Sequence, residues 1–345
     1  MGTLRRMVLV APRPLQRPTS GAAAGPGGGA AGGATGGGAR NAAGGAGAAG
    51  GGEVLALLRD TAARPSFDPG LAGGLRAWLE DAAYGVVASR GDLAPPLVLG
   101  PREVLGPGPG PRPGPRPGPR PGPGLGPAGG EDGELSEEVV ASRLVHALFR
   151  RLIVDGALGD PLGDALDACR AEAPGGAGAA TVASVEALDE PARAALGAVV
   201  ATHAAHLADL VPRFATAWMP RTDDRVAIPL AGGRVVLHGI FDLLVGLPRP
   251  DTASLCALGL CTGGSWARER RSLHYLALLE TLRSGTPPFR LALLETSSGR
   301  YGIEDVREEH LRAIASHLAA WLGAVADGAD GVDGVAGGPG GTEHG

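Results

Sequence analysis

The chain has 345 residues, of which 60 are glycine and 30 are proline, and a formal net charge of -5. Glycine and proline gather in tracts, so the length that can fold is much shorter than the chain. All 31 basic residues are arginine. This excludes Schiff-base chemistry, a Walker-type lysine and a lysine general base, because a guanidinium does not give up its proton. The negative charge argues against a generally basic nucleic-acid coat, although a local arginine patch remains compatible with it.

Cysteine content and hydropathy indicate the compartment. Three cysteines, Cys169, Cys256 and Cys261, are too few and too irregularly spaced for a disulfide framework or a four-ligand zinc site. Residues 1–10 carry a short apolar run, but no hydrophobic segment of signal-peptide length follows. No window reaches the length that spans a bilayer. We therefore expect a cytoplasmic protein without a membrane partner.

The first third of the chain divides by composition into three parts. Residues 1–52 are of low complexity and rich in glycine and alanine, and we expect them to be disordered because they have little to bury. Residues 53–105 form a small patterned helical segment. One helical face in it carries three large apolar residues, Leu75, Trp78 and Leu79. Residues 106–133 repeat Pro-Gly-Pro-Arg and predict an extended linker.

Residues 134–324 show regular hydrophobic patterning and predict an α/β domain. Helices are expected at 136–154, 190–210, 268–284 and 304–324. Strands are expected at 225–230, 234–245, 254–261 and 289–295. Ala231-Gly-Gly233 is typical of a tight hairpin between the first two strands. The Gly/Asp-rich residues 325–345 predict a disordered tail.

Four stretches of this domain carry the resemblance to a known family through their order along the chain. They are Ser142-Arg-Leu-Val-His146-Ala-Leu-Phe149, Gly239-Ile-Phe-Asp242, Arg271-Ser-Leu-His-Tyr275 through Arg283, and Phe289 through Leu294. With the element order helix, three-strand meander, helix, strand, they resemble the core of the PD-(D/E)XK nuclease superfamily, in particular its RecB-like branch. The resemblance covers about residues 136–324. It implies that His146 and Asp242 are metal ligands, that Asp242 and Tyr275 belong to the catalytic site, and that an active member would use Mg²⁺ or Mn²⁺.

Phosphodiester cleavage in this family also needs an acid and a lysine two residues apart on the next strand. The aligned positions are Gly259 and Cys261, which supply neither an oxygen ligand for magnesium nor an amine. Glu280 or Glu295 could bring a carboxylate from a neighbouring element. A lysine cannot be relocated, because the chain has none.

Each of these residues also has a structural interpretation. His146 and Tyr275 would fit equally well as core residues of amphipathic helices. Asp242 lies in an apolar strand, where a carboxylate must be paired or metal-bound, and an arginine is the alternative partner to a metal. Arg268, Arg270 and Arg271 are either a solvated helix start or the first choice for contacts with a nucleic-acid backbone.

The leading hypothesis is a nuclease-like pseudoenzyme of DNA processing whose phosphodiesterase activity is lost or impaired. One alternative is a non-catalytic module that binds nucleic acid or a partner nuclease or helicase subunit. Another is an active metal-dependent nuclease with relocated catalytic residues. A scaffold without any such role is the third, although the clean patterning of residues 225–324 argues against wholesale decay.

Overall fold

The computed structural model describes residues 65–91, 94–106, 135–172, 175–211, 214, 218–249 and 252–330. The segment 1–52, nearly all of the linker 106–133 and residues 331–345 lie outside this description, so their predicted disorder stays a prediction. None of the described helices combines the length and the apolar character that crossing a bilayer requires.

A six-stranded mixed sheet lies at the centre of the described residues. Its strands are β1 (Leu97–Leu99), β2 (Arg221–Leu230), β3 (Val235–Val245), β4 (Cys256–Cys261), β5 (Arg290–Glu295) and β6 (Arg300–Asp305). The order is β1-β3-β4-β5-β6, and β2 pairs with β3 along nearly its whole length. The other edge of β3 pairs with β1 at residues 235–237 and with β4 at residues 243–245. Between these two contacts, β4 separates from β3.

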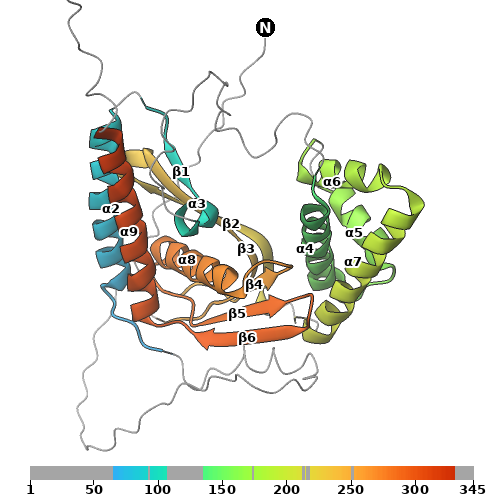
Figure 1. Cartoon of the computed structure of the whole chain (residues 1–345). Helices are drawn as coiled ribbons and strands as arrows, with labels where there is room; N and C mark the ends of the chain where they lie inside the picture. Colours follow the sequence, from blue (N-terminus) through green and yellow to red (C-terminus); the bar gives the residue numbers. More distant parts are fainter. Residues whose placement is uncertain are drawn as a thin grey trace, which may run out of the picture. The chain divides into compact units, whose positions relative to one another are not determined.

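Eight described α-helices surround the sheet (Figure 1). They are α2 (Leu71–Arg90), α3 (Pro101–Leu105), α4 (Glu137–Asp155), α5 (Pro161–Arg170), α6 (Ala177–Glu186), α7 (Glu190–Leu210), α8 (Trp266–Ser284) and α9 (Glu308–Asp330). Helices α2 and α9 lie side by side and pack with α8 on one face of the sheet. Helices α4 and α7 contact β4, β5 and the end of β3 through a second apolar cluster.

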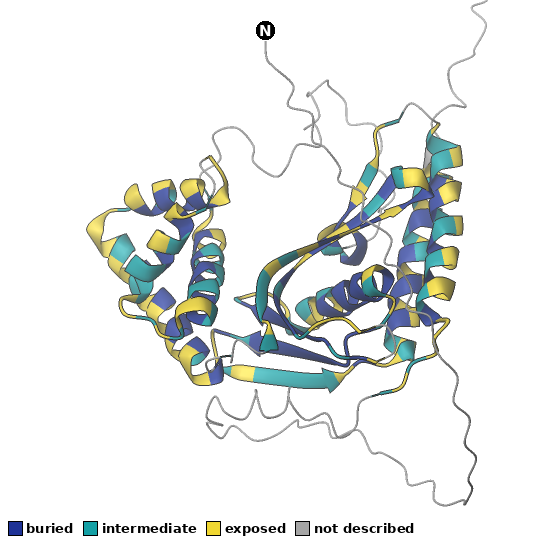
Figure 2. Cartoon of the chain, turned by 180° about the vertical axis from the view of Figure 1, so that it is seen from behind, coloured by how far each residue is buried: buried dark blue, intermediate teal, exposed yellow. Residues whose placement is uncertain are grey.

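Helix α8 shows how burial selects its sequence. Its second half, residues 273–282, is buried on all sides between the sheet and the α2–α9 pair (Figure 2). A helix surrounded in this way needs apolar residues around its whole circumference rather than along one stripe. It ends at Gly285, whose φ of 84° gives the left-handed cap that glycine adopts without strain.

The expected mixed α/β class is confirmed, and the predicted order of helix, three strands, helix and strand is present as α4, β2, β3, β4, α8 and β5. Residues 231–233 form the predicted turn between β2 and β3. Three details are corrected. Residues 300–305 form β6, so α9 begins at Glu308 rather than 304; it continues to Asp330, past the expected start of the tail; and α5 and α6 fill the interval between the helices 136–154 and 190–210.

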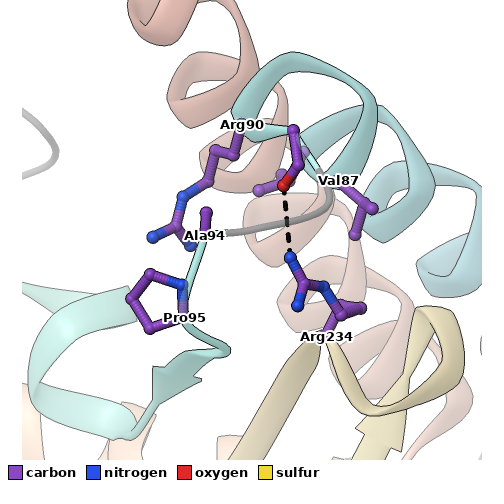
Figure 3. A pocket seen from close by; sticks show the side chains of 7 residues that line it. Val87, Arg90, Ala94, Pro95 and Arg234 are labelled. Atoms are coloured by element: carbon purple, nitrogen blue, oxygen red, sulfur yellow. Dashed lines mark hydrogen bonds between the residues drawn. The ribbon is translucent and has the colours of Figure 1, made fainter.

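The N-terminal described segment belongs to the same core as the rest. Leu75 and Leu79 are buried in the cluster that α8 and α9 share, whereas Trp78 remains 43% exposed. At the C-terminal end of α2, Arg234 Nη2 donates a hydrogen bond to the carbonyl oxygen of Gly91 at 3.2 Å (Figure 3). This bond ties the end of α2 to the start of β3.

Candidate functional site

A polar stripe on α4 forms the centre of the candidate site. Ser142, His146 and Arg150 recur every four residues, so their side chains lie on one face of the helix. Each reaches a different part of the sheet. The Ser142 hydroxyl lies 2.8 Å from the Thr262 hydroxyl after β4, His146 Nδ1 lies 3.0 Å from an Asp242 oxygen on β3, and Arg150 Nη1 lies 3.1 Å from an Asp223 oxygen on β2.

Asp242 lies where β3 and β4 part. The β3–β4 ladder ends at the pair Leu243↔Leu258, and one carboxylate oxygen of Asp242 then accepts a hydrogen bond from the Leu260 amide at 2.8 Å. The other carboxylate oxygen faces His146. The Asp242 side chain therefore replaces a ladder bond that the separating strands no longer make.

Two opposing effects set the protonation of His146. Burial alone lowers its pKa, since a buried cation loses hydration, and Arg150 acts in the same direction. The charge of Asp242 and the hydrogen bond to it outweigh burial, so the pKa of His146 is raised. The geometry therefore favours an imidazolium–carboxylate pair.

The strand face toward α4 differs from the one that the sequence predicted. A side chain at Gly259 would meet Leu273 of α8, and Cys261 belongs to the apolar cluster that contains the buried residues of α8. Leu260 instead packs with α4 residues, and Thr262 contacts Ser142. The residues on the side of α4 are thus Leu260 of β4 and Thr262, directly after β4. Neither supplies a carboxylate or an amine.

Tyr275 is placed in the core, away from the α4 face. It is fully buried, its hydroxyl donates to the Leu99 carbonyl at 2.9 Å, and burial raises its pKa. This bond ties α8 to β1. The placement gives Tyr275 a structural role, and the catalytic role that the resemblance implies stays a prediction.

The two carboxylates expected to reach inward are engaged by arginines. Glu280 is buried and accepts from Arg283 Nε at 2.7 Å, and Glu295 pairs with Arg300 at 3.0 Å. Burial raises the pKa of Glu280. Both carboxylates are therefore held by arginines, Glu280 by Arg283 and Glu295 by Arg300.

The pKa of Glu269, in the first turn of α8, is affected by the charges of Asp242 and His146. Its pKa is raised, first by burial and then by the negative charge of Asp242, while Arg268, Arg102 and His146 act in the opposite direction. Sequence reasoning missed it, because Glu269 stands within a run of charges at a helix start. Its place directly after β4 was the available signal.

The three arginines in the first half of α8, Arg268, Arg270 and Arg271, are all exposed. Arg270 differs from the other two because it donates through Nε to both carboxylate oxygens of Glu304, at 3.0 and 3.1 Å. Burial acts to raise the pKa of Glu304, but hydrogen bonds from His274 and Arg270 outweigh it and lower the pKa to about 2. Arg270 is thus part of a structural network, and its role in phosphate binding stays a prediction.

Comparison of the chain with protein-family models, curated proteins and solved structures finds no match. The site must therefore be interpreted from its own geometry.

A divalent cation does not fit the donors that the site offers. Magnesium prefers about six oxygen ligands, several of them water, arranged around one or two carboxylates. Here both oxygens of Asp242 already have hydrogen-bond partners, one of which is the supposed second ligand, His146. Within the described part of the chain, no three His, Cys, Asp or Glu side chains gather in a metal-binding arrangement. The stripe therefore forms a junction of paired polar and charged groups.

Proposed function

We propose that the chain is a degenerate, RecB-like member of the PD-(D/E)XK nuclease superfamily that serves DNA processing without cleaving phosphodiesters. One observation carries the proposal. His146 and Asp242, from elements far apart in sequence, meet where β3 and β4 separate, and the residues there on the side of α4 are Leu260 of β4 and Thr262, directly after β4. The place of a catalytic site is kept while its chemical groups are absent.

The missing groups explain why hydrolysis is lost or strongly reduced. An attacking water must be deprotonated, and charge developing on the phosphate must be neutralised. Leucine and threonine do neither at these positions, and an arginine can supply charge but not act as a base. No lysine exists in the chain to replace the missing one.

A cleavage assay on single- and double-stranded DNA with Mg²⁺ or Mn²⁺ tests the proposal. The full chain is expected to cut no faster than its Asp242→Ala variant. Robust cutting that disappears in Asp242→Ala would contradict the loss of activity.

The assay also tests the second candidate, an active nuclease with a relocated acid. The electrostatic coupling of Glu269 to Asp242 and His146 favours this alternative. It requires that Glu269→Gln abolish metal-dependent cutting, whereas Glu190→Gln, in the exposed first turn of α7, leaves cutting unchanged.

The non-catalytic role that we propose is a platform for DNA or for a partner nuclease or helicase subunit. The support is the exposure of Arg268 and Arg271, together with Arg102 of α3, which lies within electrostatic reach of Glu269. Binding through phosphate contacts would weaken as salt rises. Replacing Arg268 and Arg271 by alanine should weaken DNA binding, whereas Arg307→Ala, directly before α9, should not. Equal binding by both variants would exclude the two arginines as the contact, and no binding at low ionic strength would remove DNA as the partner.

The cytoplasm is the compartment that we propose. Cys169, Cys256 and Cys261 are all buried and free, which suits a reducing environment.

A further inference from the structure

The polar stripe on α4 has a role of its own. We propose that the pair of His146 with Asp242 works as a metal-free clamp that holds α4 on the junction of β3 and β4. This inference rests on contacts within the chain, and it stands whether or not the chain descends from a nuclease.

The first step of the argument is the commitment of the Asp242 carboxylate. One oxygen receives the Leu260 amide and the other lies 3.0 Å from His146 Nδ1. A cation at this carboxylate would have to displace a backbone amide or a histidine. A histidine ring nitrogen satisfies the same carboxylate without a metal and joins two elements that are remote in sequence.

The second step is the continuity of the stripe. Ser142 and Arg150 lie one turn to either side of His146 and bind Thr262 and Asp223. The stripe therefore crosses from the end of β4 over β3 to β2. It runs beside an apolar contact in which Val145 and Phe149 of the same helix pack with strand residues. Burial of the apolar residues provides attraction, and the three polar contacts define which turn of α4 meets which strand.

The third step concerns Asp223, which has a φ of 52° inside β2. Non-glycine residues adopt this left-handed region at a cost of about 1–3 kcal/mol when the surroundings enforce it. Here the Asp223 carboxylate pairs with Arg150, which also pairs with Glu172 after α5. The strained residue thus lies at one of the three contacts, where α4 enforces its conformation.

A double-mutant cycle on the full chain measures the clamp. His146→Ala and Asp242→Asn are each expected to lower Tm by about 3–10 °C, because a charged hydrogen bond between partly buried groups is lost. The double variant should lose clearly less than the sum of the two, since either change alone breaks the pair. Asp242→Asn keeps an acceptor for the Leu260 amide, so this variant should remain folded. An exposed pair, Arg170 and Glu186, provides the matched control and should show almost no coupling.

Metal titration separates the clamp from a metal site. Tm should be the same in EDTA, Mg²⁺ and Mn²⁺. Additive effects of the two substitutions would overturn the clamp, as would saturable stabilisation by Mn²⁺ that Asp242→Asn removes. DNA cleavage and binding measured on the same proteins report on the proposed function separately, so its failure leaves the cycle interpretable.

Discussion

Gly239 provides a sharp test of how the sheet and α8 fit together. A Cβ atom at this position would lie 2.2 Å from Leu276 Cδ2 and 3.5 Å from Leu279 Cδ1. The glycine of the Gly-x-x-Asp stretch is therefore explained by the close approach of α8 to β3. We expect Gly239→Ala to destabilise the protein through overpacking, without any reference to catalysis.

The structure sets the size of this effect. Leu276 is buried in the core, with only 8% of its surface exposed, so it has to change rotamer against packed neighbours. Overpacking of this kind costs about 1–3 kcal/mol. For a folded region of this size, the loss corresponds to a fall in Tm of roughly 2–10 °C.

Thermal and urea unfolding of four variants would check this. In the Gly239→Ala background, Leu276→Ala should cost less than it does alone, because the added methyl group fills part of the space it leaves. Gly85→Ala is the control: its Cβ would have no neighbour within 4 Å in α2, and it should gain about 0.5–1 kcal/mol. An unchanged midpoint for Gly239→Ala, or full additivity with Leu276→Ala, would refute the packing argument.

Two further predictions concern buried polar groups. Tyr275→Phe removes the hydrogen bond to Leu99 and should lower the free energy of unfolding by about 1–3 kcal/mol in urea titrations, because the buried Leu99 carbonyl is left unpaired; an unchanged value would contradict this. Burial, and then the neighbouring His206, lower the pKa of His203, so its neutral form stabilises the fold above pH 6.5, and this stability is lost as pH falls from 6.5 toward the lowered pKa. His203→Asn, which can keep the bond to Thr296, should therefore show a smaller loss of Tm between pH 7.5 and 5.5 than the parent chain; equal losses would exclude His203 as the cause.

Local pattern predicted most of the domain because its elements carry clear apolar signals. Helix α4 and strands β2 and β3 follow an apolar spacing, α8, β4 and β5 carry continuous buried runs, and glycines mark the hairpin between β2 and β3. Strand β6 escaped prediction because none of its residues is buried. Glu304 was assigned to the last helix for the same reason, although its contacts with His274 and Arg270 hold it in the strand.

The place of β1 could not be predicted from local pattern at all. It has three residues, and it pairs in parallel with Val235–Leu237, far along the chain. No local signal specifies a contact across such a distance. Tyr275 shows the consequence. Its hydroxyl donates a hydrogen bond to the Leu99 carbonyl of β1, and this partner could not be predicted without the position of β1.

The candidate site was foreseen in its residues but not in its geometry. The resemblance brought His146 and Asp242 together, and their side chains do meet. The alternative partner considered for Asp242 was an arginine, whereas the arginine of the stripe, Arg150, pairs with Asp223 instead. The four-residue spacing of Ser142, His146 and Arg150 predicts that they share one face of α4. Only the order of the strands shows which partner each of them contacts.

A break in the side-chain alternation of β3, at one residue, determines which residues of β4 lie on the same side of the sheet as Asp242. Phe241 packs in the apolar cluster with residues of α8, whereas Leu243 packs in the apolar cluster with residues of α4. Residues two apart on a regular strand would share a face. The alternation therefore breaks at Asp242, opposite the left-handed Asp223 of β2. Asp242 turns to α4 while Gly259 stays toward α8, so a prediction that assumed regular strands was wrong by one residue.

This irregularity leaves the functional argument intact. In the regular register the missing acid and lysine would fall at Gly259 and Cys261, and in the observed one at Leu260 and Thr262. Thr262 is the one residue of the two pairs with a side-chain oxygen, and neither pair supplies a carboxylate or an amine, so the proposed loss of hydrolysis is the same in both alignments. The observed register adds that Leu260 contributes its backbone amide to Asp242 and its side chain to the apolar contact with α4. Leu260 thus stabilises the junction that the clamp holds.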